Sequence, residues 1–256
     1  MKNIFAKTFT LISILALAAC SSDTINASGE SHSSDALIIS TLWLQKSHEA
    51  DWLMEQSYEQ AKGKLMVNRL VYANSLKKAV VLDLDETVLD NSPYEARVIK
   101  NGSSFSKDSW TAWVQEAKAD LIPGSKSFLN FADSLGVEIF YISNRSIENL
   151  GATIDNLNAH RLPNADSSHI LLKTDDSDKS ERRALVGKQS RIILLIGDQL
   201  GDFNERVNYE LRDSMLQHFI LLPNPMYGNF SRLPDSIKST TEAEKLAWFR
   251  QQLNSN

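Results

Sequence analysis

The sequence predicts an α/β fold in which a parallel β-sheet is flanked by helices and a smaller helical part lies beside it. Two observations lead to this prediction: short apolar runs recur along the chain, and helical patterns separate most of them. The runs are nearly continuous in their apolar character, which is typical of strands buried on both faces of a parallel sheet. A chain of 256 residues that is 42% hydrophobic is long and apolar enough to bury a sizeable core.

The first 19 residues have the pattern of an export signal. Lys2 and Lys7 precede a short apolar run that extends from residue 9 to residue 19 and ends in small residues. A helix that spans a bilayer needs about 20 apolar residues, so a permanent transmembrane anchor is the weaker interpretation. The sequence therefore predicts a signal peptide over residues 1–19.

Cys20 is the only cysteine of the chain, and it directly follows the predicted signal peptide. The stretch "LAAC" resembles the lipobox of bacterial lipoproteins, and this resemblance implies lipidation of Cys20 and attachment to a membrane. Ser21 follows the cysteine, which by the same resemblance implies the outer membrane. The alternative is an ordinary secretory signal that ends near Ala19, with a periplasmic protein carrying a free thiol at Cys20. Either interpretation places the protein in the bacterial cell envelope.

Residues 20–35 are polar and rich in serine, so we expect a flexible tether there. Residues 36–256 then form one domain, whose core begins at about residue 79. Residues 36–76 mix apolar and polar positions without strict alternation, which predicts a helical layer beside the sheet. A helical insertion is expected at about residues 91–122. The formal charge of −5 argues against a nucleic-acid polymer as partner, because such polymers are bound mainly through clustered lysine and arginine.

Five apolar runs are the candidate strands of the main sheet, and they cover residues 79–85, 137–143, 169–173, 191–197 and 219–222. Helical patterns lie between most of them, at residues 127–136, 147–160, 178–189 and 202–215. This alternation of strands and helices favours a Rossmann-like parallel sheet covered on both faces.

Polar side chains stand at the carboxyl ends of four predicted strands. In open parallel sheets, ligands bind outside these ends. The residues concerned are Asp83, Asp85, Ser143, Asn144, Lys173, Asp198 and Asp202. Carboxylates gathered in this way repel one another unless a cation lies among them or some are protonated, and oxygen ligands suit Mg²⁺ better than Zn²⁺. Taken singly, each motif has an ordinary structural interpretation as a helix cap, a turn or a surface lysine.

The motifs "DLDET", "ISN", "LLK" and "GDQLGDF", in this order, resemble the four motifs of the haloacid dehalogenase superfamily of phosphohydrolases. With "SWTAWV", "LPNPMYG" and the lipobox, the chain resembles class C acid phosphatases over about residues 80–230. The resemblance implies the haloacid dehalogenase fold and a Mg²⁺-dependent acid phosphatase. Its expected substrates are small phosphate monoesters, with nucleoside 5′-monophosphates or nicotinamide mononucleotide as leading candidates. A homodimer is also a reasonable expectation.

The same resemblance implies the roles of individual residues. Asp83 is expected to be the nucleophile and Asp85 the general acid and base. Mg²⁺ is expected to be bound by Asp83, the main-chain carbonyl of Asp85, Asp198 and Asp202, and the phosphoryl group by Ser143 and Asn144. Lys173 is expected to neutralise the aspartyl-phosphate; Lys179 is the other lysine of this motif, and Lys173 is preferred because it ends the strand.

Three aromatic residues match positions that line the substrate side in class C acid phosphatases: Trp110, Tyr227 and Phe230. They are candidates for stacking on a flat leaving group, whereas Trp113 is expected to pack in the core. Two other functions remain as alternatives: a surface binding lipoprotein without catalysis, and a metal-dependent glycosyltransferase that uses its D-x-D motif. The intact Asp83 and Asp85 argue against the first alternative, and the second aspartate pair argues against the second.

Overall fold

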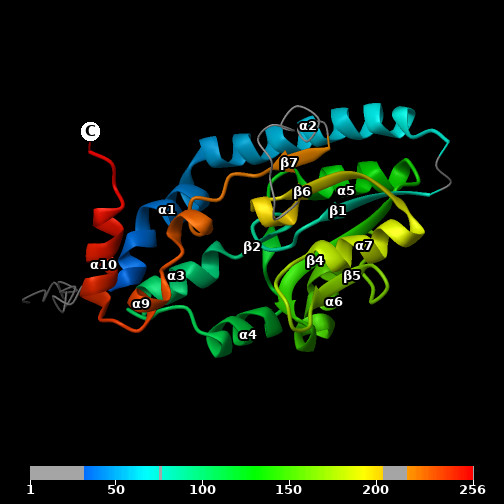
Figure 1. The fold of residues 1–256 in the computed structure, drawn as a ribbon. Coiled ribbons are helices and arrows are strands. Elements are labelled where there is room, and N and C mark those ends of the chain that lie inside the picture. Colours follow the sequence, from blue (N-terminus) through cyan, green and yellow to red (C-terminus); the bar gives the residue numbers. More distant parts are fainter. Residues whose placement is uncertain (1–31, 75–76, 204–217, 256) are drawn as a thin grey trace, which may run out of the picture. The chain divides into compact units, whose positions relative to one another are not determined.

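The structure is a computed structural model that describes residues 32–74, 77–203 and 218–255. The predicted signal peptide and Cys20 lie outside the described residues. Five parallel strands form the main sheet in the order β5-β4-β1-β6-β7 (Figure 1). They are β1 (Lys78–Leu82), β4 (Glu138–Ser146), β5 (Ile170–Lys173), β6 (Arg191–Gly197) and β7 (Phe219–Leu221). The predicted fold class is therefore confirmed, and β6 has the predicted limits.

The central strand β1 pairs with β4 on one side and with β6 on the other. The chain first builds the sheet outward from β1 through β4 and β5, and then returns to the other side for β6 and β7. The order of the strands thus reverses at β1. A crevice forms at such a point outside the carboxyl ends of the strands, because the connections on either side diverge to opposite faces. β1 ends at Leu82, so Asp83 and Asp85 lie just beyond it at this point.

The sheet is buried on both faces, as its apolar strands predict. Val80 and Leu82 of β1 belong to the larger core, while the alternate residues Ala79 and Val81 belong to a smaller core with Val186. Helices α2 (His48–Val71) and α5 (Ser125–Ser134) pack together, and α2 also contacts β6 and β7. Helix α7 (Ser180–Gln189) contacts β4 and β6. Figure 1 shows α2 running along the sheet beside α5.

Helix α2 is the main element of the predicted N-terminal helical layer. Ser47 caps it, with its side chain accepting a hydrogen bond from the Ala50 amide. Its buried residues recur every three or four positions, so a single stripe of the helix faces the core. They are Ala50, Met54, Tyr58, Ala61, Leu65 and Asn68.

The segment between β1 and α5 carries two helices, α3 (Ser92–Lys100) and α4 (Lys107–Gln115), within the predicted insertion. The short antiparallel strands β2 (Leu89–Asp90) and β3 (Asp120–Leu121) pair with each other and bring the two ends of the segment together. The segment therefore begins and ends close to the carboxyl end of β1, where it can contribute side chains to a crevice.

The remaining elements lie at the ends of the described chain and beside the sheet. They are η1 (Ser33–Leu37), α1 (Ile38–Lys46), η2 (Ile147–Asn149), α6 (Leu150–Ala159), η3 (Leu200–Asp202), η5 (Asn229–Ser231), α9 (Asp235–Lys238) and α10 (Glu242–Gln251). Element η1 takes up the last residues of the predicted tether and packs against α3 and α10. Most of the helix predicted at residues 202–215 lies outside the described residues. No described helix combines the length and apolarity needed to cross a membrane.

Candidate active site

A tight loop follows β1 and carries the first two aspartates. The Asp83 amide donates to the Ile196 carbonyl at 3.0 Å, which keeps the chain in line with the sheet. The carbonyl of Leu84 accepts hydrogen bonds from the amides of Val88 and Leu89, each at 2.8 Å, so the chain turns back on itself. Glu86 has a positive φ of 57°, as this reversal requires. These contacts fix the direction in which Asp83 points.

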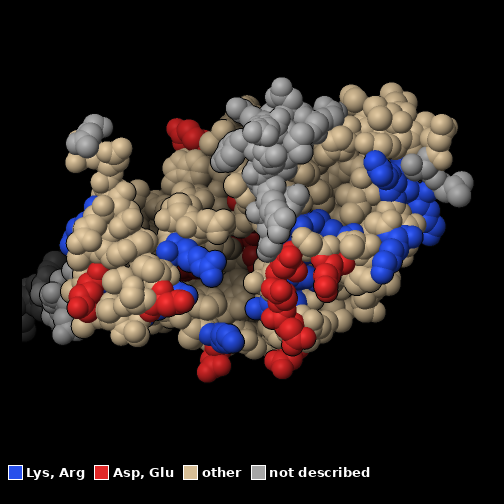
Figure 2. Space-filling view, in the orientation of Figure 1, with Lys and Arg blue, Asp and Glu red and all other residues tan. Residues whose placement is uncertain are grey.

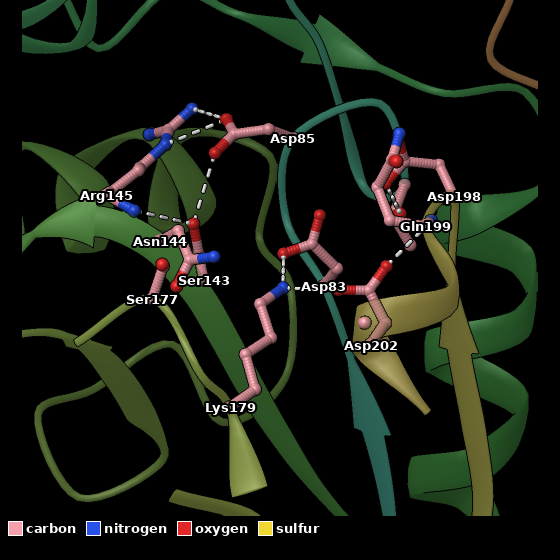
Figure 3. Close-up of polar contacts among 12 residues, drawn as sticks. Asp83, Asp85, Ser143, Asn144, Arg145, Ser177, Lys179, Asp198, Gln199 and Asp202 are labelled. Atoms are coloured by element: carbon pink, nitrogen blue, oxygen red, sulfur yellow. Dashed lines mark hydrogen bonds and ion pairs between the residues drawn. The ribbon is translucent and has the colours of Figure 1, made fainter. Parts of the chain in front are cut away.

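Three buried carboxylates meet at the carboxyl ends of β1 and β6. Asp83, Asp198 and Asp202 each offer an oxygen, and these oxygens lie within 4.8 Å of one another (Figure 3). Asp198 directly follows β6, and Asp202 ends η3. The sheet therefore brings together the two aspartate-containing motifs that the sequence places more than a hundred positions apart.

The loop after β6 orients its two aspartates separately. Asp198 Oδ2 accepts hydrogen bonds from Asn224 Nδ2 at 2.7 Å and from Gln199 Nε2 at 2.8 Å. Asp202 Oδ2 accepts one from the Gln199 amide at 2.9 Å and packs directly over Gly197. A Cβ atom on Gly197 would lie 2.5 Å from Asp202 Cβ, which is too close for any non-bonded carbon pair. Glycine is therefore required for Asp202 to reach this position.

Lys179, rather than Lys173, is the lysine beside the predicted nucleophile. Its Nζ donates to Asp83 Oδ1, and it also donates to Asp202 Oδ1 at 2.6 Å (Figure 3). Lys173 ends β5, where it pairs in register with Ser146, and it has no hydrogen bond or ion pair with the described carboxylates. The structure thus places Lys179, and not the expected Lys173, beside Asp83, because Lys173 ends β5, the outermost strand on its side of the sheet.

Burial and mutual repulsion act on the carboxylates of this cluster. Burial raises the pKa of Asp83 well above its usual value; Lys179 opposes this rise, and Asp202 and Asp198 add to it. The pKa of Asp198 is raised to about 6, mainly by burial and then by Asp202. Lys179 alone cannot balance three carboxylates. The cluster contains no histidine or cysteine, so its oxygen donors fit a hard divalent cation such as Mg²⁺ better than Zn²⁺.

Asp85 lies apart from this cluster and is held by Arg145, a residue that the sequence analysis missed. Arg145 Nε and Nη2 donate to Asp85 Oδ1 at 2.9 and 2.8 Å, and Arg145 is only 2% exposed. Asn91 Nδ2 also donates to Oδ1 at 2.9 Å, and Ser143 Oγ donates to Oδ2 at 3.1 Å. The position of Arg145 one residue after "ISN" was the only sequence signal for it.

The predicted phosphate-binding residues Ser143 and Asn144 are both at the carboxyl end of the sheet. Ser143 is fully buried, with its hydroxyl bonded to Asp85, whereas the Asn144 side chain is exposed. Arg182 of α7 fixes this end of β4, because its guanidinium donates to the Ser143 carbonyl at 2.6 Å and to Asn144 Oδ1 at 2.7 Å.

The site lies in a cleft with a volume of about 1080 Å³. Asp83, Asp85, Lys179, Asp198 and Asp202 contribute to one part of its lining. The predicted aromatic residues Trp110, Tyr227 and Phe230 also line it. Figure 2 shows this face of the molecule hollowed near its centre, with acidic side chains inside the hollow. Trp113 packs in the core, as expected, and donates to Asn91 Oδ1 at 2.8 Å.

The parallel sheet and the aspartates at its carboxyl edge define a phosphohydrolase of the haloacid dehalogenase superfamily. Residues 6–230 match the family described as HAD superfamily, subfamily IIIB (acid phosphatase), and the chain belongs to this family. It is a phosphoric monoester hydrolase that acts on small phosphomonoesters, and enzymes of this superfamily generally use a divalent metal.

The chain is also similar to individual proteins. The class C acid phosphatase from Bacillus anthracis is 37% identical, with a TM-score of 0.80 over 88% of this chain and 99% of that one. Acid phosphatase 1 from Solanum lycopersicum is 32% identical over 160 residues, which cover 57% of each chain. Vegetative storage protein 1 from Arabidopsis thaliana is 27% identical over 215 residues, covering 80% of this chain and 72% of that protein.

Proposed function

We propose that this acid phosphatase depends on Mg²⁺, acts outside the cytoplasm and hydrolyses phosphomonoesters through an aspartyl-phosphate at Asp83. The leading substrates are nucleoside 5′-monophosphates and nicotinamide mononucleotide. One observation carries the proposal: Asp83 lies at the carboxyl end of the central strand, with one oxygen bonded to Lys179 and two further carboxylates within 4.8 Å.

In the first step, an Asp83 oxygen attacks phosphorus, the bond from phosphorus to the ester oxygen breaks, and Asp85 donates a proton to the leaving oxygen. In the second step, Asp85 takes a proton from water, and the water oxygen attacks the phosphorus of the aspartyl-phosphate. Inorganic phosphate then leaves and Asp83 is restored. The separation of Asp85 from the acidic cluster supports this division of roles, because Asp85 is held by a different set of partners.

An anionic phosphoryl group can bind in this acidic site only if the site also holds positive charge. Lys179 supplies one charge directly beside Asp83. A divalent cation held by Asp83, the Asp85 carbonyl and Asp198, with Asp202 in support, would supply the rest and reduce the repulsion between nucleophile and phosphate. The main-chain N–H of Asn144 would donate a hydrogen bond to a phosphoryl oxygen, and the Ser143 hydroxyl would donate another once it releases Asp85 Oδ2. A related structure is described as the Bacillus anthracis class C acid phosphatase with tungstate bound, and tungstate, like phosphate, is a tetrahedral oxyanion.

The aromatic residues support a flat leaving group. Trp110, Tyr227 and Phe230 all line the cleft that contains Asp83. A nucleobase or pyridine ring can stack on such side chains without forming specific hydrogen bonds. This arrangement favours nucleotides over small aliphatic esters while still permitting a broad range of substrates.

The proposal is tested by phosphate release from a panel of nucleoside monophosphates and an aryl phosphate, with and without EDTA. We expect EDTA to abolish activity and Mg²⁺ to restore it. Asp83→Asn should lose activity by at least about 10⁴-fold, because it removes the nucleophile while keeping the shape of the side chain. Activity that survives both EDTA and Asp83→Asn would falsify the mechanism.

The location and assembly of the protein belong to the same proposal. Residues 1–19 would be removed, lipid on Cys20 would anchor the chain to the outer membrane, and residues 20–35 would serve as tether; attachment through more than one acyl chain is durable. Membrane fractionation of the wild type and of Cys20→Ser tests the anchor, since the variant should leave the membrane fraction. Sedimentation of the mature domain distinguishes the expected homodimer from a monomer.

A further inference from the structure

The cleft continues beyond the catalytic residues to a second end that no step of the reaction uses. This end is lined by apolar side chains of three elements, among them Leu37 of η1, Val98 of α3 and Phe249 of α10. Element η1 packs against both helices, and the Ser33 amide donates to Glu242 Oε2 of α10 at 2.8 Å. A volume of about 1080 Å³ far exceeds that of a phosphoryl group. The distal end is therefore available to the alcohol part of the substrate.

Two polar groups at this distal end have no hydrogen-bond partner in the described part of the chain. Glu95 is partly buried in the first turn of α3, and its carboxyl has no hydrogen bond or ion pair with any residue that the structure describes. Ser34 of η1 is only 4% exposed, and its Oγ likewise has no partner among the described residues. Both residues line the cleft. Burial raises the pKa of Glu95 to about 7, which reflects the lack of compensating groups around it.

Such groups are uncommon in a protein interior, because a polar atom removed from water without a partner costs free energy. The lysines at this end do not relieve the cost. Lys238 and Lys245 line the cleft but are bonded at 2.6 Å to Asp235 and Glu242, respectively. A ligand that brings a donor to Glu95 and a polar atom to Ser34 would satisfy both groups at once.

We propose that Glu95 and Ser34 form a distal subsite that binds a cationic or N–H-donating group on the alcohol part of the substrate. The inference rests on the proposed phosphatase function and narrows its substrate class. The preferred phosphomonoesters carry an amino group or another basic nitrogen far from the phosphate. The portion of the substrate that joins this nitrogen to the phosphate crosses the section of the cleft that the aromatic residues line. Glu95 acts on specificity and takes no part in the transfer of the phosphoryl group.

The test compares two series of substrates that differ in one group: ω-aminoalkyl phosphates and ω-hydroxyalkyl phosphates of increasing chain length. At the chain length that reaches Glu95, the wild type should prefer the amine by about 10-fold in kcat/KM, which corresponds to about 1.4 kcal/mol. Glu95→Gln should bring this ratio close to one, and Ser34→Ala should lower it partly. Glu55→Gln, which removes the same charge from an exposed position on α2 outside the cleft, should leave the ratio unchanged.

Hydrolysis of phenyl phosphate, which lacks a group that could reach the subsite, separates this inference from the proposed function. If the wild type releases no phosphate from phenyl phosphate, the proposed function itself is wrong. If phenyl phosphate is hydrolysed but the amine is not preferred at any chain length, the subsite is wrong. An equal loss on all substrates in Glu95→Gln would also overturn the inference, because it would indicate a structural role.

Discussion

Single residues at the carboxyl edge of the sheet differ sharply in their contacts, and these contacts define their roles. Lys179 bonds to both Asp83 and Asp202 and is only 6% exposed. A buried ammonium in this position has two functions: it limits the repulsion between the carboxylates, and it can receive the negative charge of a phosphoryl group. Lys173, at the end of β5, has no such contact with the described carboxylates.

Replacing each lysine by methionine tests this difference. Lys179→Met should lower kcat/KM by about 100-fold or more, because a charge that stabilises the transition state is lost from a buried site. Lys173→Met makes the same change in charge and size, and this variant should retain nearly full activity. Steady-state kinetics with one nucleoside monophosphate shows which of the two lysines the reaction needs. Circular dichroism confirms that both variants are folded. The reverse order of effects would restore Lys173 to the role that the sequence suggested.

Arg145 is the residue that controls the orientation of Asp85. Its guanidinium donates twice to Asp85 Oδ1 and lies 5.9 Å from the ring centroid of Trp110, so it links Asp85, the proposed general acid, to the wall of the cleft. Proton donation matters most for leaving groups that are poor without it, such as alkoxides. A positioning role for Arg145 should therefore depend on the leaving group.

Arg145→Gln should lower kcat/KM by about 100-fold for an alkyl phosphate but by less than about 10-fold for 4-nitrophenyl phosphate, whose leaving group needs little protonation. Arg182→Gln is the matched control: Arg182 contacts Ser143 and Asn144 but not Asp85, so any loss should be similar for both substrates. An Arg145→Gln enzyme with equal losses on both substrates would show that Arg145 acts on the fold alone.

At the scale of elements, the turn from β6 into η3 is the most tightly determined part of the site. Asp198 and Asp202 are four positions apart and point into the same cluster, which is possible only because the chain turns sharply between them. Gly197 permits this turn by leaving room for the Asp202 side chain. The loop after β1 is fixed from the other side by α2, whose Tyr58 hydroxyl donates to the Thr87 carbonyl at 2.6 Å.

Gly197→Ala should displace Asp202 and weaken the affinity for Mg²⁺ by about 10-fold or more, because the added methyl group overlaps the carboxylate. Isothermal titration with Mg²⁺ measures this directly. Gly187→Ala in α7 is the control, since a Cβ atom added there would meet nothing within 4 Å and alanine favours a helix. Unchanged Mg²⁺ affinity in Gly197→Ala would mean that Asp202 contributes little to the cation site.

For the molecule as a whole, the acidic cluster is a source of instability that a cation bound there would remove. Three buried carboxylates share the charge of one lysine at the centre of the sheet. A ligand that binds only the folded protein raises the free energy of unfolding by RT ln(1 + [L]/Kd), where [L] is the concentration of free ligand. The catalytic site and the stability of the domain are thus connected through the same ion.

Saturating Mg²⁺, at about 100 times its Kd, should stabilise the domain by about 2.7 kcal/mol and raise Tm by roughly 5–10 °C relative to EDTA. Differential scanning calorimetry at constant ionic strength measures the shift, with NaCl as the control for general screening. Asp198→Asn should reduce the shift, because it removes one ligand. No shift with any divalent cation would argue against a metal site at this cluster.

Much of this organisation was predictable because its signals are local in the sequence. The apolar run of β6 has the predicted limits, Asp83 and Asp198 directly follow strands as expected, and Asp202 ends the short element η3. β1 was predicted to end three residues too late, at residue 85, since the apolar Leu84 continues the pattern although the chain already turns after Leu82. The helical layer at residues 36–76 was predictable because apolar and polar positions mix there without strict alternation, and α1 and α2 lie within these limits.

The sequence by itself determined the class of fold and the acidic chemistry at the edge of the sheet, since a strand and the side chain that ends it are neighbours along the chain. Only the tertiary structure decided that Lys179 lies beside Asp83, that Arg145 holds Asp85, and that Glu95 and Ser34 line the same cleft. These pairs join segments whose proximity depends on how helices and strands pack, and no local pattern encodes such a distance. The spacing of motifs along the sequence identifies the groups that can react, and the packing of helices and strands determines which of these groups lie close together.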